Sequence, residues 1–293
     1  MTCLADIEGH IASMQELHNV VGAMRSLAGM RMQEAQRALP GIRRYAGSMA
    51  GAIGSALLLM PQGAMERPGK KGPKALVLCA GEHGFVGGFN ERLLEAAEAA
   101  LEASDALFVL GGRGALFAAE RGRQVAWTSP MATRPASVPR SVSELAAALY
   151  SRIMRGEISR VEVMFDRYRQ GSPSVIEHAL LLPLDIDLLA NQPRQAPLHN
   201  LEAGPLFEKL AAEYVFARLT EAAVESIASE NAARFAVMDS AQGNVSKKLD
   251  QLQQQAHQAR QTEITTELLD LITGAEALAG GSPGSSYTVP FMN

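Results

Sequence analysis

Apolar residues near the start of the chain recur in alternating steps of three and four positions. His18 and Arg25 are the polar exceptions, and so long a heptad repeat is typical of a coiled-coil helix. Residues 1–62 are therefore expected to form an N-terminal coiled-coil helix. Pro40 lies inside the repeat and removes one backbone hydrogen bond, so we expect a kink there rather than a helix end. The repeat comprises Leu4, Ile7, Ile11, Met14, His18, Val21, Arg25, Ala28, Met32, Ala35, Leu39, Ile42, Ala46, Met49, Ile53, Ala56 and Met60.

The pattern changes after a Pro-, Gly- and Lys-rich linker that follows Met60. Over residues 74–190, short apolar runs alternate with amphipathic segments, which predicts a Rossmann-like α/β domain with right-handed crossovers. The spacing Ser141-x-x-Glu144 resembles a capping box at the start of one helix. The expected strands are 75–81, 106–112, 125–129, 160–169 and 175–184, the last two as an antiparallel pair, and the expected helices are 91–104, 113–121 and 141–155.

A second long pattern, which contains no proline after Pro205, covers residues 204–279. It predicts a C-terminal coiled-coil helix about 110 Å long, at about 1.5 Å per residue. Its seam skips one position after Ala259, a stutter that alters the local supercoil. Residues 280–293 are expected to form a flexible tail. The seam comprises Val245, Leu249, Leu252, Ala256, Ala259, Ile264, Leu268, Leu271, Ala275 and Leu278.

The two seamed helices can bury their apolar positions by pairing with each other. The expected fold class is therefore α/β, a long antiparallel coiled coil of the N- and C-terminal helices with an inserted Rossmann-like α/β domain. Such a molecule offers few pockets and much exposed side surface. The pattern favours a mechanical or scaffolding role over an enzymatic one.

Charge and composition exclude some partners. The net charge is −4, without the basic patch of a nucleic-acid-binding protein. The longest apolar stretch, residues 50–60, is far shorter than the roughly 20 residues that span a bilayer, so no direct membrane insertion is expected. Cys3 and Cys79 are expected to be reduced thiols of a cytosolic protein.

One glycine-rich segment, GEHGFVGGFN at residues 81–90, lies where a dinucleotide-binding fold keeps its phosphate loop. Its spacing is G-x-x-G-x-x-G-G rather than G-x-G-x-x-G, which favours a structural turn. Glu82 and His83 suggest acid–base chemistry only weakly, and His10 and His18 lack further metal ligands. We therefore expect no cofactor and no metal, with a nucleotide-binding α/β protein carrying coiled-coil arms as the alternative.

Four segments resemble ATP synthase gamma subunits, the central rotor shafts of F-type ATPases. They are DIEGHIASMQELHNVVGAM (6–24), CAGEHGFVGGFN (79–90), SENAARFAVMDSAQGNVSKKLDQLQ (229–253) and ARQTEITTEL (259–268). The resemblance implies a non-catalytic subunit whose coiled coil lies inside a hexamer of alpha and beta subunits. Its α/β domain would join the epsilon subunit and the membrane c-ring, peripherally at the cytoplasmic face of the bacterial inner membrane. The coupling ion and the main direction of ATP turnover stay open.

The resemblance also assigns an interface. Met24 matches a methionine near the coupling interface, and Arg234 matches the arginine that faces it. The positions that match hydrogen-bonding contacts to a catalytic subunit are Arg260, Gln261, Thr265 and Glu267. At Val20–Gly22 and Asp239 the chain lacks lysines that are usual in the family, and it continues past the last helix, so a divergent member is expected.

Overall fold

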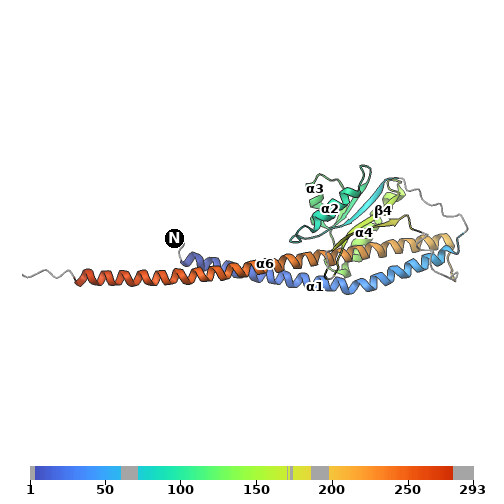
Figure 1. The fold of residues 1–293 in the computed structure, drawn as a ribbon. Coiled ribbons are helices and arrows are strands. Elements are labelled where there is room, and N and C mark those ends of the chain that lie inside the picture. The colour runs from blue at the N-terminus through green and yellow to red at the C-terminus, as the bar shows by residue number, and fades with distance from the viewer. Residues whose placement is uncertain (1–3, 61–71, 170, 172–173, 186–197, 280–293) are drawn as a thin grey trace, which may run out of the picture. The chain divides into compact units, whose positions relative to one another are not determined.

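The computed structural model describes residues 4–60, 72–169, 171, 174–185 and 198–279, the last four of these by their backbone alone (Figure 1). The chain divides into two compact units, Met1–Gly22 with Ser240–Asn293, and Ala23–Asp239. Helix α1 (Leu4–Leu57) and helix α6 (Ala203–Ala279) each contribute to both units. The predicted α/β fold with two long terminal helices is confirmed.

The unit Ala23–Asp239 contains a five-stranded sheet in the order β3-β2-β1-β4-β5. Strands β1 to β4 run parallel, and β5 pairs antiparallel with β4, as expected. The strands are β1 (Lys74–Cys79), β2 (Ala106–Leu110), β3 (Val125–Ser129), β4 (Arg160–Arg167) and β5 (Val175–Leu182). The other helices are α2 (Phe89–Ala100), α3 (Gly112–Glu120), α4 (Val138–Met154) and the 3-10 turn η1 (Pro135–Ser137).

Helices cover both faces of the sheet, which explains why its central strands are apolar along their whole length. Ala75, Val77 and Cys79 of β1 face a core formed with α4, α1 and α6. Leu76 and Leu78 face the second core, formed with α2 and α3. These two helices lie on one side of the sheet (Figure 1). Helix α6 is therefore enclosed, and each residue from Leu219 to Asn231 is buried.

The heptad of α1 correctly identifies its buried face. The fully buried apolar side chains of this helix, within the described residues, all belong to the repeat. Arg25 lies half-buried and pairs with Asp239 of α6 at 2.8 Å, consistent with a seam residue that meets a polar partner. The helix continues past Pro40 to Leu57, as expected.

In the unit formed by Met1–Gly22 and Ser240–Asn293, the seam of α6 is only partly buried. Leu249 and Leu252 are buried, whereas Ile264, Leu268 and Leu271 are 51–70% exposed. Arg260 of α6 pairs with Glu8, close to the point where α1 begins at Leu4. Beyond Arg260, the apolar seam residues of α6 in the described part of the chain are therefore mainly exposed.

The predicted start of α4 at Ser141 is wrong. The helix begins at Val138 and has Pro139 in its first turn, a position that suits the fixed φ of proline. The residue before it, Ser137, makes no side-chain capping bond. Cys3 and the tail 280–293 lie outside the described residues. The domain limits 1–62, 74–190, 204–279 and 280–293 stay predictions.

Candidate partner interface

The glycine-rich loop after β1 is held by its own side chains. The amide of Gly81 donates to Oδ1 of Asn90 at 2.8 Å. The Glu82 carboxylate accepts from the amides of Gly112 at 2.8 Å and Met131 at 2.7 Å. Gly112 is the first residue of α3, and a helix N-terminus is the usual place for a bound phosphate. The anion position that a nucleotide would use is therefore taken by Glu82.

A glycine lets α3 approach β1 closely. A Cβ at Gly114 would lie 2.1 Å from the Cβ of Ala80, so no other residue fits without displacement. Helix α3 therefore packs directly on the residue that follows β1, where the glycine-rich loop starts, and the role of the loop as a structural turn stays a prediction.

Arg234 ties this loop to α6. It is 6% exposed. Its guanidinium donates to the carbonyl oxygens of Gly84 (3.2 Å) and His83 (3.4 Å). It also donates to Asn231 Oδ1 at 3.0 Å and Glu230 Oε1 at 2.5 Å. Glu230 in turn accepts from the amide of His83 at 3.3 Å. The side chain predicted to face a partner is thus satisfied within the chain.

Met24 and Arg234 line the same hollow, and their role at an interface stays a prediction. The hollow has a volume of about 290 Å³. Phe85, 65% exposed, stands at its edge with a φ of +61°, a conformation that non-glycine residues rarely adopt. An exposed aromatic held in a strained turn beside an apolar hollow is suited to contact with another chain. The lining residues are Met24, Leu27, Ala28, Arg31, His83, Gly84, Phe85, Asn231 and Arg234.

The other four predicted interface residues belong to the unit that contains Ser240–Asn293, and all are exposed. Nη2 of Arg260 donates to Oε1 of Glu8 at 2.8 Å, and both side chains are at least half exposed. The hydroxyl of Thr265 donates to the carbonyl oxygen of Gln261 at 2.8 Å, leaving the Gln261 amide group at the surface. Glu267 lies one position before the exposed Leu268. The roles of these residues stay predictions.

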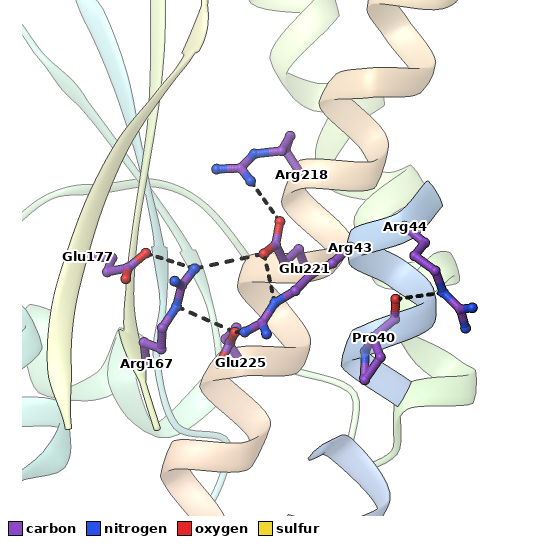
Figure 2. A network of polar contacts seen from close by, with 8 residues as sticks. All are labelled: Pro40, Arg43, Arg44, Arg167, Glu177, Arg218, Glu221 and Glu225. Carbon is purple, nitrogen blue, oxygen red and sulfur yellow. Dashed lines mark hydrogen bonds and ion pairs between the residues drawn. The ribbon is translucent and has the colours of Figure 1, made fainter. Parts of the chain in front are cut away.

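Sequence reasoning missed a buried charge cluster on α6 (Figure 2). Glu221 is 5% exposed and Glu225 1% exposed. Arg43 of α1 and Arg167 of β4 both lie against these two carboxylates. The sequence did contain a sign of this cluster: Glu221 and Glu225 lie four residues apart within an apolar stretch. Two like charges at this spacing destabilise a helix unless cations lie nearby.

Burial and neighbouring side chains shift the pKa of several groups. It raises the pKa of Glu225, while the hydrogen bond from Arg43 and the charges of Arg43 and Arg167 offset part of the rise. For Glu162 the opposing effect of burial is outweighed by His178 and Lys74, so its pKa is lowered. Burial raises the pKa of the Cys79 thiol to about 12, which makes it a poor nucleophile at neutral pH.

The described ranges contain no cluster of three or more His, Cys, Asp or Glu side chains that could hold a metal ion. No helix among the described residues combines the length and apolar character that crossing a membrane requires.

A family model, curated relatives and a solved structure each match nearly the whole chain. A family model described as ATP synthase matches residues 3–278. The ATP synthase gamma chains of Prosthecochloris aestuarii and Bdellovibrio bacteriovorus are each 26% identical, covering 96% of this chain and 100% of the relative. A chain of the Euglena gracilis mitochondrial ATP synthase shares the fold at a TM-score of 0.60 and 13% identity, over 98% of this chain and 99% of that one. Because the family model spans residues 3–278, this chain belongs to the ATP synthase family.

Proposed function

We propose that this chain is the central-stalk rotor subunit of an F-type ion-translocating ATP synthase. It couples ion-driven rotation of a membrane c-ring to conformational change in the catalytic subunits. The observation that carries the proposal is a pair of antiparallel terminal helices with an inserted α/β domain, in a chain that matches gamma chains over their whole length. A chain from the Tetrahymena thermophila central stalk and c-ring has the same fold, with a TM-score of 0.55.

The partners are the alpha and beta subunits around the helices, and the epsilon subunit and c-ring at the α/β domain. A rotor acts by making different contacts with each catalytic subunit at each angle, which favours a different conformation in each. The chain is peripheral, at the cytoplasmic face of the bacterial inner membrane, and makes no direct membrane insertion. It does not bind nucleic acid.

The end of α6 supports this arrangement. Ile264, Leu268 and Leu271 are more than half exposed, and clustered apolar side chains at a surface mark a site of protein contact. The exposed polar residues Gln261 and Thr265 alternate with them. Polar contacts of this kind can be exchanged as the helix turns, whereas a wholly apolar interface would hold at one angle.

The hollow beside Met24 and Arg234 forms a second contact surface in this proposal. Its apolar lining and the exposed Phe85 support binding of a partner side chain. Arg234 contributes by holding the loop that carries Phe85. Arg260 and Glu267 complete the proposed surface on α6.

The chain carries no catalytic site and binds no cofactor in this proposal. The alternative is a nucleotide-binding α/β protein with coiled-coil arms. Glu82 disfavours it, because its carboxylate already occupies the N-terminus of α3 and would repel a phosphate there. Calorimetric titration of the purified chain with ATP, ADP and NAD separates the two, and saturable tight binding would favour the alternative.

Reconstitution tests the rotor proposal directly. The full-length chain is mixed with alpha and beta subunits from the same source, and the product is weighed by native mass spectrometry. We expect a single copy of the chain in each alpha–beta hexamer, with ATP hydrolysis stimulated by its presence. A hexamer that excludes the chain would contradict the proposal.

A further inference from the structure

Six charged side chains meet where α1, α6 and the sheet come together (Figure 2). We call this group the charged joint. It contains three arginines and three glutamates, so it is formally neutral. Its members are Arg43 from α1, Arg167 from β4, Glu177 from β5, and Arg218, Glu221 and Glu225 from α6.

Both α6 carboxylates are shared between α1 and the sheet. Oε1 of Glu221 lies 3.3 Å from Nε of Arg43 and 3.8 Å from Nη2 of Arg167. Oε1 of Glu225 accepts a hydrogen bond from Nη2 of Arg43 and lies 3.5 Å from Nε of Arg167. Each carboxylate therefore links α6 to both α1 and β4. Because Arg43 and Arg167 share the same two carboxylates, neither arginine can move away without disturbing the contacts of the other.

The outer members hold one arginine and one carboxylate of the joint in place. Nη2 of Arg167 contacts Oε2 of Glu177 on the neighbouring strand at 2.9 Å. Arg218 donates to the second oxygen of Glu221 at 2.8 Å. The two central carboxylates are nearly inaccessible to water, so separating them from their cations would leave buried charges uncompensated.

The apolar contacts near the joint restrain the helices in a less directional way. The neighbouring buried residues include the small Ala222 and Ala223 as well as the larger Leu219 and Val224. Apolar attraction is non-directional, so it resists separation of helices more than it resists their rotation or sliding. Shared ion pairs are directional, and a polar residue within a helix interface can fix its register.

We infer that the charged joint is the torque-bearing connection between the helix pair and the α/β domain, with Arg43 and Arg167 as positioning residues. The inference rests on the proposed rotor function. If the α/β domain is turned by a c-ring, then torque reaches α1 and α6 through their contacts with the sheet. The joint keeps those helices from slipping against the domain under load.

The first test measures the joint in the full-length chain, independently of any rotor. Spin labels are placed at Gln33→Cys on α1 and Glu120→Cys on α3, both exposed positions, in a Cys3→Ser background. Cys79 is buried and stays unlabelled. Double electron–electron resonance then gives the distribution of distances between the labels.

Arg43→Gln should broaden that distribution, and Arg43→Lys should broaden it less because it retains a cation. Arg44→Gln is the matched control, because the adjacent Arg44 is exposed and its Nε donates to the carbonyl of Pro40 in its own helix (Figure 2). An equally narrow distance distribution in all variants would overturn the claim that the charged joint restrains α1 against the α/β domain. If Arg43→Gln folds poorly, Arg43→Gln with Glu225→Gln removes both charges and serves in its place.

The second test uses the assembled enzyme in membrane vesicles. We expect Arg43→Gln to lower ATP-driven ion pumping per ATP hydrolysed, with hydrolysis retained, and Arg44→Gln to leave the ratio unchanged. A broadened distance distribution with unchanged pumping per ATP would overturn the torque-bearing role and leave the rotor proposal intact. Failure of the wild-type chain to assemble would overturn the rotor proposal itself, while the distance measurement still judges the joint.

Discussion

Replacing Arg234 with methionine tests whether this side chain holds the glycine-rich loop or serves a partner alone. Methionine keeps much of the apolar stem and removes the guanidinium. The change deletes the bonds to the carbonyls of His83 and Gly84 and the ion pair with Glu230. The buried Glu230 then keeps one hydrogen-bond donor from the loop, the amide of His83, which lies 3.3 Å from Oε1 of Glu230.

The expected cost follows from burial. The side chains of Arg234 and Glu230 are 8% and 5% exposed, so water screens their interaction little. Breaking a buried ion pair by removing one partner costs about 3–5 kcal/mol. Because the His83 amide still solvates Glu230, we expect the lower end, about 3 kcal/mol. At about 2–4 °C per kcal/mol for a unit of this size, the unfolding midpoint falls by roughly 6–12 °C.

Circular dichroism follows the unfolding midpoint, and hydrogen exchange at the His83 amide reports the loop itself. Arg140→Gln is the control, because the exposed Arg140 pairs with the exposed Glu144 one turn along α4 and its loss should cost less than about 1 kcal/mol. Arg234→Met with Glu230→Gln should be less destabilising than Arg234→Met alone, because the second change removes the unpaired buried charge.

One result would refute this reasoning. An isolated Arg234→Met chain with an unchanged midpoint and unchanged exchange at His83 would show that the bonds of Arg234 contribute nothing to the fold. The side chain would then act through a partner alone.

Three further changes probe other parts of the molecule. Glu82→Ala leaves two amide donors without their acceptor and should lower stability by about 1–3 kcal/mol, measured by urea unfolding; no change would contradict the capping role. Arg43→Gln should cost about 1–3 kcal/mol at pH 8, less than a fully buried pair because Arg43 is half exposed. Burial already raises the pKa of Glu225, so its ionised form opposes folding. The stability lost on Arg43→Gln should therefore become smaller as the pH falls toward the ordinary carboxyl pKa, because Glu225 is then protonated and needs no cation. A stability loss that does not change with pH would count against this account. Gln261→Ala with Thr265→Ala should slow coupled turnover through loss of about 1–3 kcal/mol of contact while assembly is retained, and unchanged turnover in the assembled enzyme would remove the assignment.

Local periodicity was enough to predict much of the fold. The heptad gave the buried face of α1, because a helix places every third or fourth residue on one side whatever its partner is. The central strands could be recognised because helices cover both faces of the sheet, which makes runs such as Ala75–Cys79 wholly apolar. The start of α4 was missed because Pro139 suits a first helical turn, and the capping-like pattern at Ser141 competed with that signal.

Long-range pairing could not be read from the sequence. Arg43 and Glu225 are 182 positions apart, and their meeting depends on the register of α1 against α6. The burial of Arg234 likewise depends on how the loop at His83 folds back over α6. Among the described residues, Leu268 lies two turns beyond Arg260, which pairs with Glu8 of α1, and its side chain is more than half exposed.

Rotation of the chain inside its hexamer is the most direct test of the central claim. The alpha–beta hexamer is fixed to a surface, and a bead is attached through Glu120→Cys, an exposed position on α3. The account predicts bead rotation in one direction that requires ATP and stops when ATP is removed. A hexamer that hydrolyses ATP with this chain bound while the bead stays at one angle would contradict it.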